Sequence, residues 1–101
     1  MAYITTVRGR LLHDDVAAAM DQHNGIVARV RQRGEPLGNV AHTVYANAQD
    51  PREFLAIDTW NSIEGLQTMM GDPSVQAELG SMFDGMPEVT VWAARDGWTT
   101  F

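Results

Sequence analysis

The segment FLAIDTWNSIEGL, residues 54–66, joins two different hydrophobic patterns. Residues 53–60 have the apolar, β-branched and aromatic side chains that are typical of a β-strand. Asn61 is followed three residues later by Glu64, which is the spacing of a capping box and predicts a short helix that runs through Met70. The segment therefore predicts a strand that leads almost directly into a helix.

The chain before this segment predicts two strands with a long helix between them. Residues 2–12 alternate between two sides, which is typical of a strand. From Val16 the apolar residues recur at intervals of three and four, as on one face of an amphipathic helix. Gly34 is placed to end that helix in the left-handed conformation. Residues 40–46 alternate again, and a short loop joins this strand to the next as a hairpin.

The chain after the segment predicts a second helix and a last strand. Asp72 is a capping residue and Pro73 suits the first helical position, so a helix begins here, and residues 89–93 predict the fourth strand. The order strand–helix–strand–strand–helix–strand is that of a ferredoxin-like α+β domain, with two helices on one face of a four-stranded antiparallel sheet. Because the other face needs a cover, we expect a symmetric partner and hence a homodimer.

The last residues carry a second hairpin signal. Asp96-Gly97 favours a two-residue turn that would return residues 98–101 to the fourth strand, with Trp92 opposite Phe101. The sequence leaves open whether this tail docks on its own sheet or on that of a partner.

Composition excludes several classes of function. The length of 101 residues predicts a single domain spanning 1–101, and seven basic against 13 acidic residues give a net charge of −6, which disfavours nucleic acid as a partner. The sequence contains no cysteine and no lysine, which excludes thiol catalysis, thiolate metal sites and Schiff-base chemistry. Because neither a leader segment nor a stretch of about 18 apolar residues is found, we expect a soluble, cytoplasmic protein without membrane contact.

Residues 54–66, together with residues 72–75 (DPSV), resemble the antibiotic biosynthesis monooxygenase family. That family has a hydrophobic strand ending in acid-x-Trp, a Ser-x-Glu-Ala-Leu-like helix, and a small helix that begins with Ser-Pro or Asp-Pro. Here Asp58 stands where Glu is commoner, and Gly65 where Ala is typical. The resemblance implies a dimeric α+β barrel with a ligand cavity between the sheet and the helices of each subunit.

The resemblance also implies a range of activities. Two are oxidoreductase reactions, the cofactor-free oxygenation of phenols and quinols and the oxidative breakdown of haem, and a third is lactone isomerisation. Haem-degrading relatives use an Asn on the first strand and a His on the late helix. Here the first strand offers Thr5 and Thr6, and residues 73–86 contain no histidine, so haem degradation is disfavoured. We therefore expect a cofactor-independent monooxygenase that acts on a small aromatic, quinol or polyketide-like substrate. The alternative is a non-catalytic dimeric barrel that binds a hydrophobic small molecule or serves as an interaction module.

Oxygenation without a cofactor needs a base that deprotonates the substrate, and histidine is the natural choice. His23 lies on the apolar face of the first helix and would point at the sheet, followed by Asn24 as a candidate donor to the substrate anion. Gly25, a poor helix former, would admit the close approach of a ligand. The alternative for His23 is an ordinary core histidine.

His42 shares one face of the second strand with Val40 and Val44. One hairpin register places it among Leu55 and Ile57; the other places it beside Asp58 and Trp60, where the carboxylate could orient the imidazole. Trp60 is then either a core aromatic or an N–H donor to the ligand.

The remaining polar candidates are weaker. Tyr45 is either a strand aromatic or a cavity phenol, and the arginines at 29, 31 and 33 are expected to form a solvated helix end. No pair among His13, His23 and His42 has the spacing of a metal motif, so no metal site is predicted. The sequence does not identify the substrate.

Overall fold

The computed structural model describes residues 2–101, which form one antiparallel sheet with strand order β2-β3-β1-β4. The elements in chain order are β1 (Tyr3–Arg10), α1 (Val16–Gly34), the 3-10 helix η1 (Glu35–Leu37), β2 (Asn39–Asn47), β3 (Asp50–Trp60), α2 (Ile63–Met70), α3 (Pro73–Gly80) and β4 (Glu88–Ala93). The predicted ferredoxin-like α+β fold is confirmed, with α2 and α3 together filling the place of the second helix. In this described part of the chain, no helix is long and apolar enough to cross a membrane.

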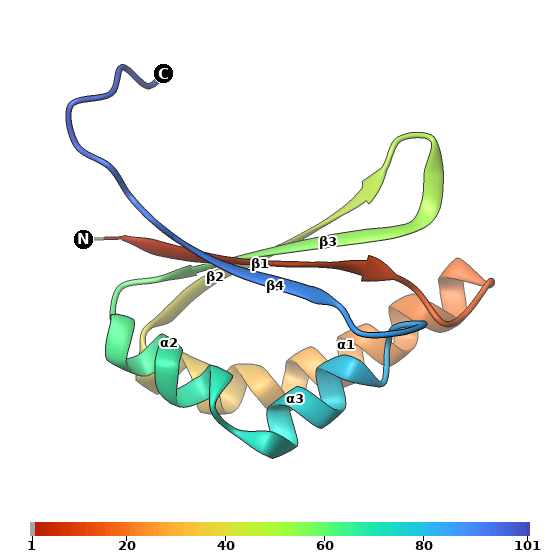
Figure 1. Cartoon of the computed structure of the whole chain (residues 1–101). Coiled ribbons are helices and arrows are strands. Elements are labelled where there is room, and N and C mark those ends of the chain that lie inside the picture. Colours follow the sequence, from red (N-terminus) through yellow and green to blue (C-terminus); the bar gives the residue numbers. More distant parts are fainter. Residues whose placement is uncertain (1) are drawn as a thin grey trace.

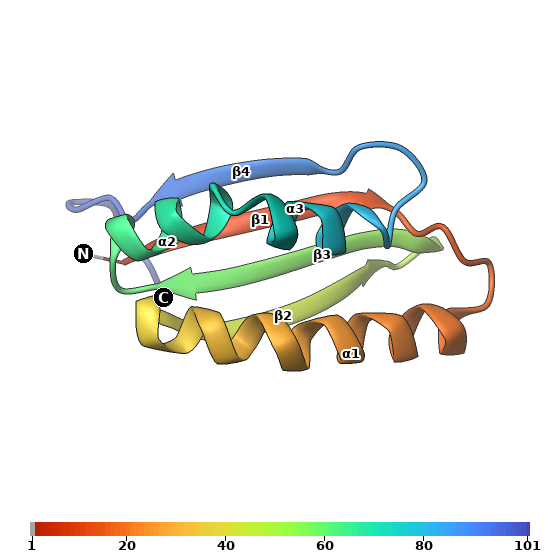
Figure 2. The same ribbon diagram turned by 90° about the horizontal axis from the view of Figure 1, so that it is seen from below.

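All helices lie on one face of the sheet, as Figure 1 shows. Figure 2 views the molecule from the helical side: α1 runs along β2, and α2 and α3 run beside β1 and β4. The other face of the sheet carries no helix. Tyr45 and Trp92 lie on this open face, each about half exposed, and the Trp92 Nε1–H donates to Thr6 Oγ1 at 3.0 Å.

The end of α1 differs from the prediction. Gly34 is buried in right-handed helical conformation, and its α-carbon packs close to the side chains of Asn39 and Met69. The left-handed position is Gly38, with φ of +102°, after the extra turn of η1. The lack of a side chain at Gly34 therefore leaves room for Asn39 and Met69, and Gly38 makes the turn into β2.

The start of α2 is shifted by one residue from the prediction. Ser62 is the capping residue, and its Oγ accepts a hydrogen bond from the Gly65 N–H at 3.1 Å. Asn61 instead donates its backbone N–H to Gly38 O at 2.9 Å, which ties the end of β3 to the turn before β2. Asp72 caps α3 as predicted, through a 2.9 Å bond from the Ser74 N–H.

The core lies between the sheet and the helices and has two adjoining parts. Both combine inward-facing side chains of the sheet with apolar side chains of the helices, and the first part also includes Leu11, Met82 and Phe83, which lie outside the strands and helices. One part contains Val7, Leu11, Ala19, Ile26, Phe54, Ala56, Met82 and Phe83, and the other Trp60, Leu66, Met69 and Val75. Burial of this one helix-facing layer holds the elements together.

The tail beyond β4 projects away from the sheet on its open side (Figure 1). The last contact with the sheet is the bond from Ala94 N to Ala2 O at 2.9 Å. The turn at Asp96-Gly97 forms, but residues 98–101 make no strand and do not pair with β4 of the same chain, which was one of the two alternatives that the sequence left open. Residues 94–95, which join β4 to this turn, are not in a strand. The turn therefore does not extend the hydrogen bonding of β4 into residues 98–101. Trp98 and Phe101 are left exposed.

Candidate active site

The register of the β2–β3 hairpin places His42 opposite Asp58. Of the two registers that the sequence left open, this is the one that puts His42 on the face of Asp58 and Trp60, toward the helices. A bulge at residue 40 shifts the pairing, since Asn39 is opposite Trp60 and Ala41 opposite Thr59. The bulge lets both Asn39 and His42 point inward, although they are three positions apart and side chains of a regular strand alternate between its two faces.

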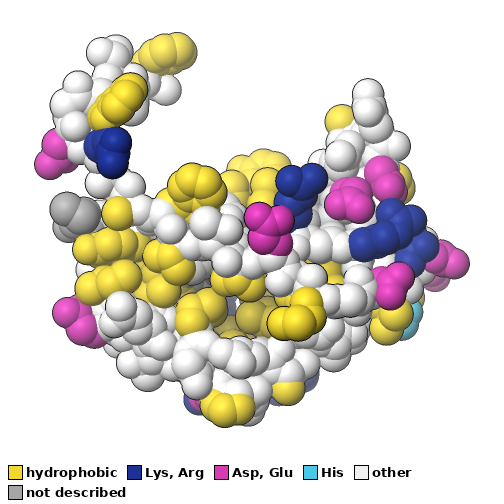
Figure 3. All heavy atoms as spheres, in the orientation of Figure 1, with side chains coloured by type: hydrophobic (Ala, Val, Ile, Leu, Met, Phe, Trp, Pro, Cys, Tyr) yellow, Lys and Arg dark blue, Asp and Glu magenta, His cyan; other side chains and the backbone are white. Residues whose placement is uncertain are grey.

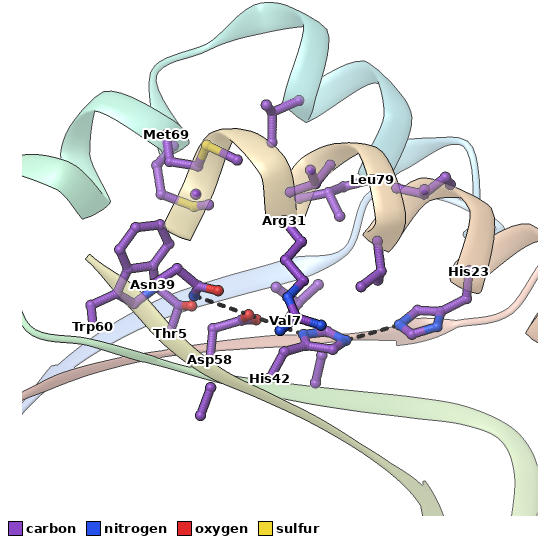
Figure 4. Close-up of a pocket in the computed structure, with 18 of the residues that line it drawn as sticks. Thr5, Val7, His23, Arg31, Asn39, His42, Asp58, Trp60, Met69 and Leu79 are labelled. Carbon is purple, nitrogen blue, oxygen red and sulfur yellow. Dashed lines mark hydrogen bonds and ion pairs between the residues drawn. The ribbon is translucent and has the colours of Figure 1, made fainter. Parts of the chain in front are cut away.

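His23 and His42 form a continuous hydrogen-bonded chain with Asp58 across the space between α1 and β2 (Figure 4). Asp58 Oδ1 lies 3.0 Å from His42 Nδ1, and His42 Nε2 lies 3.0 Å from His23 Nε2. The chain continues to Asn24, whose Oδ1 lies 2.9 Å from His23 Nδ1. Asn39 Nδ2 approaches Asp58 Oδ1 at 3.4 Å, so this oxygen has two donors.

The chemistry of the two end groups fixes how protons are arranged along this chain. Ionised Asp58 only accepts, so His42 carries its proton on Nδ1, and its Nε2 accepts from the Nε2–H of His23. When the rings of His23 and His42 are both neutral, His23 Nδ1 is an acceptor, and the side-chain NH₂ of Asn24 must be its donor. When the two rings together carry three N–H protons, the Nδ1–H of His23 donates to the Asn24 oxygen instead. A half-turn of one exposed amide therefore accommodates both states.

A pocket of about 330 Å³ lies beside this chain, between the sheet and the helices. Its volume falls in the range of small-molecule sites. The polar groups converge on the β2 side, where the side chains of His42 and Asp58 are 26% and 21% exposed. The apolar wall comes from α1, α2 and α3, and includes Ile26, Val27, Val30, Met69, Met70, Val75 and Leu79.

Trp60 lies at one end of the pocket and is 3% exposed. Its Nε1–H is the buried side-chain polar atom that has no hydrogen-bond partner within residues 2–101. A buried donor without a partner costs free energy, of the order of 1–3 kcal/mol, which a ligand acceptor would recover.

Two predicted site residues lie away from the pocket. Tyr45 is on the opposite face of the sheet, because it is an odd number of residues from His42 along β2 and strand side chains alternate. Asn24 is exposed on α1 and contacts His23 rather than the pocket. Gly25 is exposed too, so it does not admit a ligand.

Four polar residues that line the pocket were not predicted as site residues, namely Thr5, Arg31, Glu35 and Asn39. Asn39 could not be found because a bulge, which the sequence does not signal, turns it inward. Arg31 was assigned to the solvated helix end, yet it lines the pocket. Its signal was its spacing, since His23, Val27 and Arg31 follow one another at every fourth residue and so share one line of the helix. No group of three or more His, Asp or Glu side chains within residues 2–101 is placed to hold a metal ion.

No protein-family model and no curated protein sequence matches this chain. Solved structures do match. Rv0793 from Mycobacterium tuberculosis has a TM-score of 0.69 at 18% identity, covering 98% of this chain and 100% of that one. SnoaB, a cofactor-independent oxygenase from Streptomyces nogalater, has a TM-score of 0.67 at 14% identity, covering 94% of both chains. A third, an antibiotic biosynthesis monooxygenase, has a TM-score of 0.68 at 13% identity, covering 94% of this chain and 99% of that one. These likenesses confirm the ferredoxin-like α+β fold of the subunit that the sequence resemblance implied.

Proposed function

We propose, from the fold that this chain shares with the antibiotic biosynthesis monooxygenases, that it is a cofactor-independent monooxygenase acting on a small phenol, quinol or polyketide-like aromatic. The observation that carries the proposal is the chain from Asp58 through His42 to His23 at the edge of an apolar pocket. A carboxylate, an oriented imidazole and a dry cavity are what deprotonation of a phenol requires.

The substrate hydroxyl would insert between the two imidazoles and replace their 3.0 Å contact. Its O–H would donate to His42 Nε2, and its oxygen would accept from the Nε2–H of His23. His42 would then act as the base, with Asp58 stabilising the imidazolium that forms. The phenolate oxygen would be held by both rings, in a pocket where such hydrogen bonds are strong. Trp60 would donate its free N–H to a second oxygen of the substrate.

The chemistry after deprotonation needs only dioxygen as co-reactant. For an anthrone-type substrate, the hydroxyl is that of its enol tautomer, in which one hydrogen of the ring CH₂ has moved to the oxygen. The phenolate that His42 forms from it transfers one electron to O₂, and the resulting radical and superoxide combine into a peroxide on the ring carbon that keeps the other hydrogen. The imidazolium returns its proton to the peroxide. Loss of the remaining hydrogen on that carbon, with cleavage of the O–O bond, gives the quinone and one water. One O₂ is consumed per substrate, and the ring CH₂ becomes C=O.

The test is oxygen consumption and quinone formation with anthrone as substrate. We expect turnover by the unaltered protein, and a loss of about 10²–10⁴-fold in kcat for His42→Ala, since that is the usual contribution of a general base. His13→Ala is the matched control, because His13 is exposed at the start of the helical region and takes no part in the pocket. Unchanged turnover in both His42→Ala and His23→Ala would refute the assigned roles.

One observation favours the second candidate, a non-catalytic ligand-binding or interaction module. Every ring nitrogen of His23 and His42 already has a hydrogen-bond partner, so the ligand-free site presents no free base. If anthrone binds the pocket without oxygen uptake above the uncatalysed rate, the binding module is the correct function.

We also propose that the protein is a homodimer whose two open sheet faces meet. Support comes from the aromatic side chains of Tyr45 and Trp92 on that face and from the projecting tail (Figure 3 shows hydrophobic side chains on the tail and on the sheet beneath it). Large exposed apolar areas are typical of interaction surfaces. A stable monomer at micromolar concentration in light scattering would contradict this assembly.

A further inference from the structure

Arg31 is the one arginine among the described residues that line the pocket. It follows His23 and Val27 at every fourth position of α1, so its side chain leaves the helix on the pocket side. Figure 4 shows it extending from α1 toward His42 and Asp58. Within residues 2–101, Arg31 is therefore the one permanent positive charge at the rim of the pocket, where the carboxylates of Glu35 and Asp58 are also among the lining groups.

The neighbouring arginines of α1 have a different role. Arg29 Nε bonds Glu78 Oε1 of α3 at 2.8 Å, and Arg33 bonds Ser74 Oγ at 3.0 Å. Both hold α1 to the other helices. Arg31 makes no bond to α2 or α3 within residues 2–101, so packing of the helical layer does not account for it.

The present partner of Arg31 is Glu35, one turn further along, which accepts from the guanidinium Nε. The two side chains are 71% and 53% exposed. An exposed pair of this kind contributes little to stability, so exchanging it for another anion costs little. The terminal nitrogens of Arg31 remain available for the two parallel hydrogen bonds that guanidinium makes with a carboxylate.

We propose that Arg31 binds a carboxylate carried by the ligand, so that the ligand class is an aromatic compound with a hydroxyl group at one end and a carboxylate at the other. The hydroxyl end rests on the proposed function, in which it meets His42. The carboxylate end rests on Arg31 alone. With a net charge of −6 the protein repels anions in general, and the preference for an acid must come from this local cation.

The experiment compares two ligands by isothermal titration calorimetry in the absence of turnover. The probes are 2-naphthol and 6-hydroxy-2-naphthoate, which differ by one carboxylate opposite the hydroxyl. We expect the unaltered protein to bind the naphthoate about tenfold more tightly, as one charge-assisted pair implies. Arg31→Gln should abolish this preference, so that the two probes bind this variant with equal affinity. Glu35→Gln, which removes the competing anion, should strengthen naphthoate binding severalfold.

Arg29→Gln is the matched control, since it removes an equal charge from the same helix outside the pocket and should preserve the preference. The inference is overturned if the unaltered protein binds both probes equally or neither, or if Arg31→Gln keeps the preference. Its failure is distinct from that of the oxygenase. A protein that selects naphthoate through Arg31 but consumes no oxygen with any phenol refutes only the proposed function.

Discussion

At the scale of single residues, Asp58 determines which nitrogen of His42 carries the proton. Asp58→Asn removes the negative charge that holds the proton on Nδ1, so the Nε2 atom that should receive the substrate proton is no longer reliably free. We expect a fall of about 10²-fold or more in kcat with little change in KM. Nitrogen-15 NMR of the histidine rings should show the loss of the Nδ1–H form.

The control for this substitution is Asp21→Asn, an exposed carboxylate on the outer side of α1. It should leave both the NMR signature and kcat unchanged. An Asp58→Asn variant with normal kcat and an intact Nδ1–H signal would show that Asp58 does not orient His42.

Asp50 gives a pH dependence of stability that is independent of the pocket. The backbone N–H of Arg52 and, secondly, the side chain of Arg10 hydrogen-bond its carboxylate and lower its pKa below the ordinary value of 3.8. A lowered pKa means that folding favours the ionised form. This stabilisation is present above the unfolded-state pKa and is lost as the pH falls through the folded-state value.

Asp50→Asn should therefore lower the urea midpoint slightly at pH 7. The difference in urea midpoint between the variant and the unaltered protein should become smaller below pH 4. Urea titrations at pH 7, 5 and 3 measure it. A gap that is the same at all three pH values would mean that the charge of Asp50 contributes nothing.

The residue types of the site could be predicted from the sequence, but their partners could not. His42 and Asp58 were candidates, and one register of the hairpin would join them; a shift of one residue would have placed His42 among aliphatic side chains. The bond between His42 and His23 depends on how closely α1 packs over β2, which no local pattern encodes. Tyr45 was misplaced because the face of β2 that meets the pocket was not known.

At the scale of elements, the contact of η1 with α2 explains Gly65. A methyl group there would overlap the carbonyl oxygen of Leu37, so this position has no room for a side chain. Alanine is typical at the corresponding position of the family that the sequence resembles. Gly65→Ala should destabilise the protein by about 2 kcal/mol or more, because either η1 or α2 must move. Chemical denaturation measures the change.

Gly25→Ala is the matched control for Gly65→Ala. At mid-α1 the added carbon would approach only the guanidinium of Arg29, at 3.9 Å. This substitution should stabilise the protein by about 1 kcal/mol, the ordinary gain from replacing glycine inside a helix. If the two substitutions had the same effect, the close approach of η1 would not be the reason for Gly65.

Element types and order were predictable because each rests on local chemistry: alternation for the strands, intervals of three and four for α1, and capping at Asp72. Helix ends were less so. The cap fell on Ser62, whose Oγ accepts from the Gly65 N–H, while Asn61 bonds Gly38 through its backbone N–H. Gly34 keeps a right-handed conformation that leads into η1, at a place where a side chain would press on Asn39 and Met69. Both ends carry tertiary contacts that local patterns do not encode.

At the scale of the whole molecule, we expect the tail to contribute to the interface of the proposed dimer. Trp98 and Phe101 have no contact that would justify two exposed aromatic side chains in a monomer. Replacing both with serine should weaken dimerisation by about tenfold or more, since buried aromatics are frequent centres of binding energy in interfaces. Analytical ultracentrifugation measures the dissociation constant.

Thr100→Ser is the control for the tail and should leave the dissociation constant unchanged. Circular dichroism should show the same fold in all variants, because the tail contributes no strand. A dimer that is equally tight without the two aromatic side chains would show that the open sheet faces suffice.

The three tryptophans occupy three regions that respond to different events. Trp60 is buried beside the pocket, Trp92 lies on the open face of the sheet, and Trp98 is on the exposed tail. Indole emission shifts to shorter wavelength as water is excluded, so buried Trp60 should emit at shorter wavelength than the exposed Trp92 and Trp98. Ligand occupancy should quench the short-wavelength band, and subunit association should move the long-wavelength band toward the blue. The native chain thus carries its own optical labels for occupancy and assembly, with no dye attached.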